Sequence, residues 1–156
     1  GFPYHALACG LSLKVRYFDP KVGSYVTLPE VEAHGEGSQV LDWRIEERDG
    51  HSFVEFAIPR QIFDVAKLPL VIPPTVSTDK GVVISGKGPW WLTGTICRAY
   101  RTAKWIAVFT PQESARRDSE GKKWSEKFPG LAPAVVISSS DPAVKVGSVI
   151  FFNLPV

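Results

Sequence analysis

The first part of the chain alternates between apolar and polar residues, a pattern that predicts β-strands with one buried face. Residues 13–19 and 24–28 both show this alternation. Between them, Pro20 fixes φ for a turn and Gly23 tolerates a positive φ. We therefore expect a β-hairpin here, followed by a loop over residues 30–38.

A second hairpin is predicted around the Asp-Gly dipeptide at 49–50, which is typical of two-residue turns. Residues 40–47 and 52–58 alternate on either side of it. Pro59 suits the first turn of a helix. The sequence predicts this helix through residues 60–68, before a group of prolines that would end it.

The second half of the chain mixes strand and helix patterns, which favours an α/β (α+β) fold. Residues 81–85 predict a buried strand, 89–101 a helix and 103–109 a further strand. The short connections between these three elements favour a parallel βαβ unit. Residues 134–140 and 147–154 add two more strands. We expect a mixed β-sheet that contains this unit, with helices packed on it.

The composition is that of an ordinary globular domain. Hydrophobic residues make up 44% of the chain and charged residues 22%, and the net charge of +2 excludes a histone-like polycation. Cys9 and Cys97 lack the spacing of a zinc site, and the histidines are scattered. No apolar run has the length of a membrane span. We expect a cytoplasmic protein that does not enter a membrane, and we identify no metal-ligating cluster.

Residues 112–131 interrupt the pattern, because they are rich in charge and nearly free of aliphatic side chains. Their positive and negative charges nearly cancel, which argues against strong non-specific RNA binding. Two interpretations remain open. The segment is a mobile surface loop, or it docks onto another protein through Trp124 and Phe128.

The stretch GVVISGKGPWWL, residues 81–92, carries the candidate chemistry. It lacks the Gly-Lys-Ser/Thr of a Walker loop and the third glycine of a dinucleotide fingerprint. Backbone N–H groups, a helix start and a lysine nevertheless coincide in it, and all three attract anions. The loop residues are Ser85, Gly86, Lys87 and Gly88. We interpret them as a phosphate-binding loop, and the alternative is a tight turn with a solvated lysine.

Aromatic and basic residues follow this loop on the predicted helix. Trp90 and Trp91 have flat rings that can stack nucleobases, although tryptophans at a helix start more often belong to the core. Arg98 and Arg101 share a helix face, where an arginine fork suits a phosphate. A solvated basic face is the alternative. We include Trp90, Arg98 and Arg101 among the candidate ligand-binding residues.

The motif GVVISGKGP, followed by WIAVFTP, AVVISSS and VGSVI, resembles the third family of CRISPR ring nucleases, found with type III CRISPR systems. The resemblance covers residues 42–151 apart from the insertion at 112–131. It implies an antiviral protein that binds cyclic tetra-adenylate, a cyclic oligoadenylate messenger, and opens its ring. It also implies a metal-dependent action on RNA ends, with Mn²⁺ as the candidate ion.

The chain departs from that family at the positions implied to be catalytic. Arg98 or Thr102 replaces a helix histidine, and Thr110 and Gln112 replace the aspartate and arginine of an Asp-Pro-Arg turn. Ser140 stands where a histidine is common. None of these side chains is an acid or base that titrates near neutral pH. The resemblance therefore implies ring-nuclease catalysis that is weak or lost, with ligand binding retained.

The N-terminal segment resembles the missing part of the family motif. YFDPKVGSYVTL looks like the Asp-Pro-Arg hairpin, and the GEGSQVLDW after it is similar to VKVGSVIFF near the C-terminus. Residues 1–43 are interpreted as a half-unit and 44–156 as a complete domain, which makes a partial tandem repeat. On this interpretation Asp19, Lys21 and His5 are the candidate catalytic acid, cation and base.

Two functions from different classes remain open. The first is a type III CRISPR accessory protein that binds cyclic oligoadenylate or short RNA, as a homodimer or within a complex. The second is a non-catalytic structural subunit of a CRISPR ribonucleoprotein, docked onto other effector subunits by the 112–131 insertion. An unrelated α/β domain with a coincidental glycine-lysine loop is a third interpretation.

Overall fold

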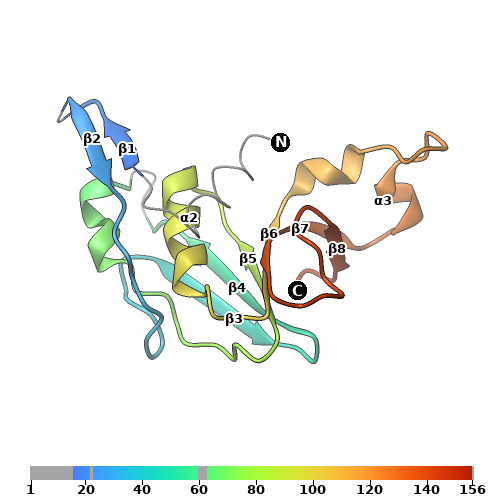
Figure 1. The fold of residues 1–156 in the computed structure, drawn as a ribbon, viewed down its shortest axis with the longest axis horizontal. Coiled ribbons are helices and arrows are strands. Elements are labelled where there is room, and N and C mark those ends of the chain that lie inside the picture. Colours follow the sequence, from blue (N-terminus) through green and yellow to red (C-terminus); the bar gives the residue numbers. More distant parts are fainter. Residues whose placement is uncertain (1–15, 22, 60–62, 156) are drawn as a thin grey trace.

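The computed structural model describes residues 16–21, 23–59 and 63–155 of the chain. Its strands are β1 (Arg16–Asp19), β2 (Ser24–Thr27), β3 (Asp42–Glu47), β4 (His51–Ala57), β5 (Gly81–Ser85), β6 (Trp105–Phe109), β7 (Ala132–Ser139) and β8 (Val149–Phe152). Its helices are the 3-10 helices η1 (Val65–Leu70) and η2 (Pro111–Ala115) and the α-helices α2 (Trp90–Ala99) and α3 (Trp124–Lys127). Figure 1 shows these elements along the chain.

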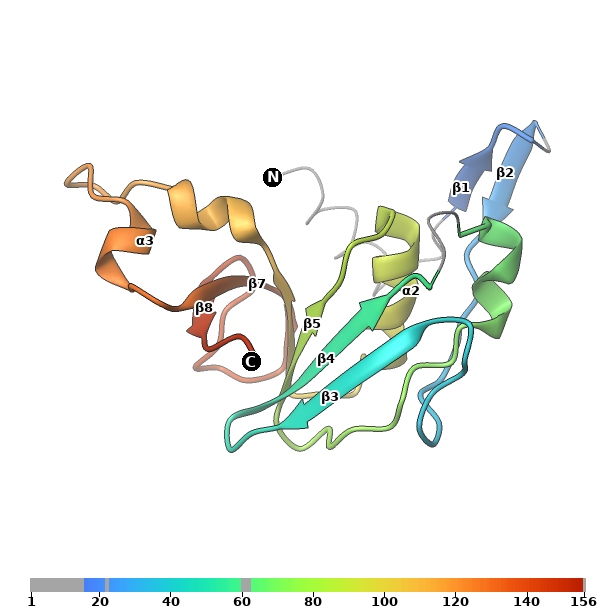
Figure 2. The same cartoon turned by 180° about the vertical axis from the view of Figure 1, so that it is seen from behind.

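Strands β3 to β8 form one six-stranded sheet, in which the spatial order follows the sequence order. β4, β5 and β6 run parallel, and the other pairings are antiparallel. The mixed sheet and its helices confirm the α/β (α+β) class, and β5, α2 and β6 confirm the predicted βαβ unit. The parallel pairing of β4 with β5 was not predicted. Figures 1 and 2 show α2 lying against one face of the sheet.

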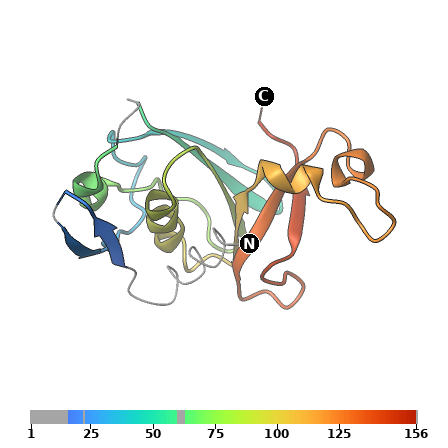
Figure 3. The ribbon, with the colours of Figure 1, turned by 90° about the horizontal axis from the view of Figure 1, so that it is seen from above.

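The sheet curls strongly but does not close. The rings of Phe53 on β4 and Phe152 on β8 have centroids 5.8 Å apart, although these strands are four places apart in the sheet. Neighbouring strands are spaced by about 4.8 Å, so a flat sheet would separate them by roughly 19 Å. Figure 3 shows the orange-red β7 and β8 turned at an angle to the teal β3 and β4. The curl therefore brings the C-terminal strands toward the face of β4 that α2 leaves open.

Two hydrophobic clusters fill the two sides of this curled sheet. The larger cluster joins the sheet to α2 and η1 and includes Val54, Phe56, Leu68, Ile84, Leu92 and Ile96. The smaller cluster lies inside the curl and consists of Phe53, Val83, Trp105, Ala107, Ala132, Ala134, Val136 and Phe152. Each face of β4 and β5 is therefore buried, which explains why residues 82–84 are apolar without alternation.

Both predicted β-hairpins are confirmed. β1 and β2 form a two-stranded sheet of their own, and Gly23 adopts a φ of +72° in the turn between them. β3 and β4 pair with Glu47 opposite Ser52, so that their turn falls at 49–50 as predicted. Residues 13–15 of the first predicted strand lie outside the described ranges.

The α-helix predicted over residues 60–68 is wrong for the part that the structure describes. Residues 63–64 are irregular, and the chain then forms the 3-10 helix η1, which contains Pro69. The Asp64 carboxylate caps this helix by accepting a hydrogen bond from the Ala66 N–H at 3.0 Å. A short α-helix is marginal, and a proline inside it cannot donate the i→i−4 bond. Residues 60–62 lie outside the described ranges.

The charged segment at 112–131 folds back onto the sheet. It contains η2 and α3, and an antiparallel bridge pairs Arg117 with Lys123. The rings of Trp124 and Phe128 lie 5.5 and 4.1 Å from the ring of Phe151 on β8. Both proposed docking anchors therefore contact the chain's own sheet, and the docking of this segment onto a partner stays a prediction.

The division into a half-unit over 1–43 and a complete domain over 44–156 also stays a prediction, since residues 1–15 lie outside the described ranges. Across the ranges that are described, no helix combines the length and the apolar character that crossing a membrane requires.

Candidate phosphate-binding loop

The loop at residues 85–88 leaves the carboxyl end of β5 and leads into α2. Ser85 is the last residue of the strand and is buried, and Trp90 is the first residue of the helix. β5 is flanked on both sides by parallel strands, because β4 and β6 run in its direction. The loop therefore lies at the edge of an open α/β sheet where ligands commonly bind.

Two glycines let this loop pass close over the core. Gly86 has a φ of +154°, and a Cβ there would lie 2.6 Å from both the ring and the carbonyl oxygen of Phe56. A Cβ on Gly88 would lie 3.2 Å from Phe56 and from Leu92. Phe56 itself is buried in the larger cluster. The shape of the loop is therefore set by the core beneath it and does not depend on a ligand.

The charge of the loop is positive. Lys87 is exposed, and within the described part of the chain its ammonium group has no ion pair and no hydrogen bond. α2 begins with no acidic residue in its first turn, and Pro89 at its N-cap provides no side-chain hydrogen bond. The partial positive charge of the helix start therefore adds to the lysine charge. Such a combination attracts an anion.

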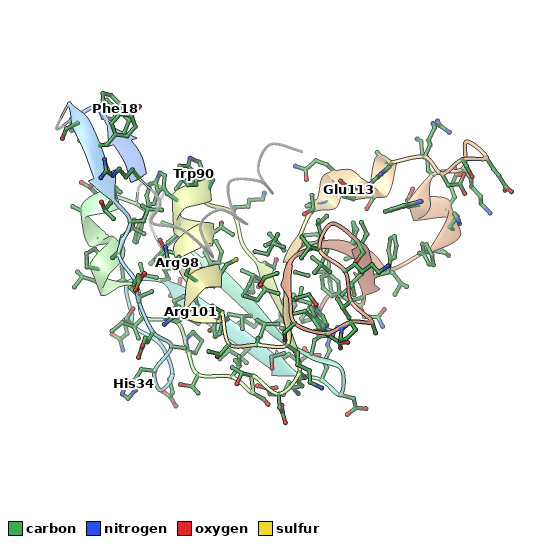
Figure 4. All side chains as sticks on the ribbon, in the orientation of Figure 1. Phe18, His34, Trp90, Arg98, Arg101 and Glu113 are labelled. Atoms are coloured by element: carbon green, nitrogen blue, oxygen red, sulfur yellow. The ribbon has the colours of Figure 1, made fainter. Side chains whose placement is uncertain are left out.

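The two tryptophans after the loop differ in their surroundings. The ring of Trp91 is buried and lies 6.1 Å from the ring of Phe63, so Trp91 belongs to the core, as one interpretation of the sequence held. Trp90 is 37% exposed at the amino-terminal end of the helix, where Figure 4 labels it. Base stacking by Trp90 stays a prediction that its exposure permits.

Arg98 lies in the last turn of α2, and Arg101 lies in the turn that follows the helix. Arg98 is buried and donates a hydrogen bond to Glu30 at 2.5 Å. Arg101 lies 3.9 Å from Glu32 and donates to the carbonyl oxygen of Arg98 at 3.2 Å. Figure 4 places both arginines below Trp90 along the helix, and eight residues of α-helix span about 12 Å. Their predicted phosphate contacts remain untested, whereas their ion pairs hold the loop after β2 against α2.

The N-terminal hairpin carries two of the three candidate catalytic residues. Asp19 ends β1, and Lys21 in the turn lies 3.7 Å from Asp64 at the start of η1. The hydrogen bond from the Ala66 N–H and the charge of Lys21 both lower the pKa of Asp64. Figures 1 and 2 place the hairpin at the same end of the molecule as the amino-terminal end of α2. His5 lies outside the described ranges, so the proposed triad stays a prediction.

The remaining positions that the family resemblance singled out have structural contacts. The hydroxyl of Thr110 donates to the carbonyl oxygen of Val108, and that of Ser140 donates to the carbonyl oxygen of Lys104. Burial raises the pKa of the Cys97 thiol to about 12, which keeps it protonated. Among the described residues, no three His, Cys, Asp or Glu side chains gather closely enough to hold a metal ion. We therefore derive no step through manganese.

Glu30 was not identified from the sequence. It lies in an irregular segment, and 68 residues separate it from the arginine that it accepts from. No local pattern marks such a pairing, because it depends on how the loop after β2 returns to α2. Its only sequence signal is an acidic residue in a loop that follows a hairpin.

Comparison with known proteins identifies a family. Residues 57–115 match the family model described as CRISPR-associated protein (Cas_csx3). An uncharacterized protein of Aquifex aeolicus (strain VF5) is 31% identical over 117 residues, which cover 72% of this chain and 88% of that protein. The segment matched by the family model includes the loop at 85–88 and the whole βαβ unit. The chain therefore belongs to a CRISPR-associated protein family.

Proposed function

We propose that this protein binds a phosphodiester-linked oligoribonucleotide in type III CRISPR defence, with cyclic tetra-adenylate as the first ligand to test. One observation carries the proposal: the exposed Lys87 and the start of α2 lie together at the carboxyl ends of the parallel strands β4, β5 and β6. Cyclic oligoadenylate and short RNA share the phosphate chemistry that such a loop attracts. Membership of a CRISPR-associated family supports the role in defence.

The proposed contacts divide between the loop and the first turn of α2. Lys87 supplies a full charge without first breaking an ion pair to another described residue. Gly86 and Gly88 carry no side chain that would keep a phosphate away from the backbone N–H groups. Trp90 stacks on an adenine ring beside the bound phosphate, since a partly exposed indole accepts any base face.

Arg98 acts as a positioning residue in this proposal. Its guanidinium is buried and paired with Glu30 about two turns away from the loop. Holding the segment after β2 against α2 keeps the helix start in place above the sheet. Arg101 extends the same attachment through Glu32 at the surface.

Ring opening by this chain is proposed to be weak or lost. Lys21, the candidate cation, already faces Asp64 at 3.7 Å. A ring that opens at all would do so by attack of a ribose 2′-hydroxyl aligned with the neighbouring phosphate. Incubation of the full chain with cyclic tetra-adenylate, with and without Mn²⁺, followed by chromatography, measures this directly. Linear product that disappears in an Asp19→Ala variant would instead establish catalysis by the hairpin.

Calorimetric titration with cyclic tri-, tetra- and hexa-adenylate tests the binding. We expect Lys87→Ala to weaken the affinity by about tenfold or more, because a hydrogen bond to a charged group contributes about 1.5–3 kcal/mol. Lys87→Arg should retain most of the affinity, since the charge is kept. Lys104→Ala is the matched control. Lys104 is also exposed, but it precedes β6 and therefore lies at the amino ends of the parallel strands.

Two results would overturn the proposal. One is the absence of binding to all three cyclic ligands and to a linear oligoadenylate, which would favour the structural-subunit interpretation. The other is binding that Lys87→Ala and Lys104→Ala affect equally, which would place the ligand elsewhere on the chain. Co-purification with other CRISPR effector subunits from the native host would then identify the assembly.

A further inference from the structure

The hairpin of β1 and β2 exposes a pair of aromatic rings that belongs to neither hydrophobic cluster. Phe18 and Tyr25 lie directly opposite each other in the hairpin. Their ring centroids are 5.3 Å apart, in an edge-to-face arrangement. Phe18 is 48% exposed and Tyr25 is 68% exposed. Apolar side chains that stand exposed together, unlike those scattered singly over a surface, mark binding surfaces.

The face of the hairpin that carries these rings also carries a cation and a hydroxyl. Arg16 lies two residues before Phe18 and therefore on the same face of β1, and Thr27 lies opposite Arg16. Both side chains are exposed, and within the described ranges Arg16 forms no ion pair. Rings, guanidinium and hydroxyl match the base, the phosphate and the ribose of a nucleotide. We call these four residues the aromatic face of the hairpin.

Contacts at both ends of the hairpin hold it beside the amino-terminal end of α2. Leu28, directly after β2, is buried in the larger cluster, which also contains Trp91. In the turn, Lys21 lies 3.7 Å from Asp64. The residue before Asp64 is Phe63, whose ring centroid lies 6.1 Å from that of Trp91. The hairpin is therefore attached to the part of α2 that directly follows the candidate phosphate-binding loop.

We propose that the aromatic face of the hairpin stacks on a second nucleobase of the oligoribonucleotide whose phosphate binds at residues 85–88. This inference rests on the proposed function and extends the site from one base, at Trp90, to two. Figure 4 shows Phe18 and Trp90 at the same end of the molecule, and Figure 2 shows the hairpin at that end from behind. In an edge-to-face pair, the rings keep open faces on which a further ring can stack. The charge of Arg16 favours an anionic occupant over another protein.

Calorimetric titration of the full chain with linear tetra-adenylate and tetra-uridylate tests the proposal. We expect tighter binding of tetra-adenylate, because a purine covers more of an aromatic ring than a pyrimidine does. Tyr25→Leu removes the flat ring and should weaken the binding of tetra-adenylate by about tenfold, the effect of losing one stacked base. It should also reduce the preference over tetra-uridylate. Tyr25→Phe is the matched control and should retain both the affinity and the preference.

The change in base preference separates ligand binding from a structural role. A cross-strand aromatic pair also stabilises a hairpin, but its loss from a merely structural position would weaken both ligands alike. Such equal weakening would overturn the proposal. Photocrosslinking of the unmodified chain to an 8-azido-substituted tetra-adenylate gives a second measurement. Mass spectrometry should find the label on Phe18 or Tyr25, and a label confined to α2 would also overturn the proposal.

Lys87→Ala in the same titrations distinguishes this inference from the proposed function. If Lys87→Ala weakens binding and Tyr25→Leu does not, the loop remains the site, and the aromatic face is assigned to a protein partner instead. If Tyr25→Leu weakens binding and Lys87→Ala does not, the aromatic face is supported and the loop is overturned. A wild type that binds neither tetranucleotide would overturn both.

Discussion

β5 carries a glycine-lysine pair at each of its ends, and the two pairs have different roles. Lys80 and Gly81 stand at the amino end, and Gly86 and Lys87 at the carboxyl end. At Gly81 and at Gly86, any side chain would clash with an aromatic ring. A Cβ on Gly81 would lie 1.9 Å from the ring of Trp105, and one on Gly86 would lie 2.6 Å from that of Phe56. The backbone at each end is therefore fixed by the core.

The two lysines distinguish the ends. The Lys80 ammonium lies 2.8 Å from the Glu47 carboxylate and also donates to the carbonyl oxygen of Arg48. Glu47 in turn accepts a hydrogen bond from the buried Ser52 hydroxyl at 2.7 Å. Lys87 has no comparable neighbours among the described residues. Lys80 is thus part of the fold, because Glu47 pairs with it, whereas Lys87 has no ion pair among the described residues.

The largest expected effect is on the glycine at the amino end. Gly81→Ala should lower the free energy of unfolding by about 3 kcal/mol, the upper part of the usual range for overpacking, because the buried Trp105 ring has little room to move. Urea denaturation measures the change. Gly50→Ala is the matched control, because a Cβ there meets nothing within 4 Å. A Gly81→Ala variant as stable as Gly50→Ala would show that Trp105 is not held against β5.

Removing the structural lysine should have a smaller effect. Lys80→Met keeps the apolar stem but removes the ammonium donor from the Arg48 carbonyl oxygen and from the Glu47 carboxylate, which keeps the Ser52 donor. We expect a loss of about 1–2 kcal/mol in the free energy of unfolding, the usual cost of unpaired polar groups that are partly buried. Equal stability of Lys80→Met and Lys104→Met, in the same denaturation experiment, would count against a structural role for Lys80.

Acid should weaken the contacts that Glu47 makes with Lys80 and Ser52. Burial raises the pKa of Glu47, but hydrogen bonds from Lys80 and Ser52 and the charge of Lys80 together lower it by more, to below its ordinary value of 4.5. A lowered folded-state pKa gives stability that is present above pH 4.5 and lost as the pH falls through the folded value. The unfolding free energy of Glu47→Gln should therefore fall less steeply with acid than that of the wild type. Parallel acid profiles for the two proteins would contradict this prediction.

Much of the fold around β5 could be predicted from local patterns. The turn at 49–50, the strand at 81–85 and the helix after Pro89 all follow from periodicity and turn chemistry, which act over a few residues. The 3-10 helix η1 was missed because the predicted helix ran from residue 60 and ended before Pro69, whereas η1 begins at Val65 and includes Pro69. Local sequence thus gave the elements of the βαβ unit and the place of its loop.

The contacts that separate the two lysines could not be predicted in this way. Glu47 reaches Lys80 across 33 residues, and Arg98 reaches Glu30 across 68. The curl that brings Phe152 to Phe53 is also a property of the whole sheet. Such pairings depend on strand order and register, which a single sequence does not specify. For this reason Arg98 was predicted from the sequence to contact a ligand, whereas in the structure it pairs with Glu30.

The smallest effect is expected at Lys87, and its sign is opposite to that at Lys80. A cation beside a helix start opposes the helix dipole, whereas an anion there is favourable. Lys87→Glu should therefore leave the free energy of unfolding unchanged or raise it by about 0.3 kcal/mol at low salt, while binding of an anionic ligand is lost. Paired denaturation and titration measurements on Lys87→Glu and Lys80→Met would separate the two ends of β5. A stability loss in Lys87→Glu as large as that in Lys80→Met would make Lys87 a structural residue as well, and would remove the physical basis for a ligand at the loop.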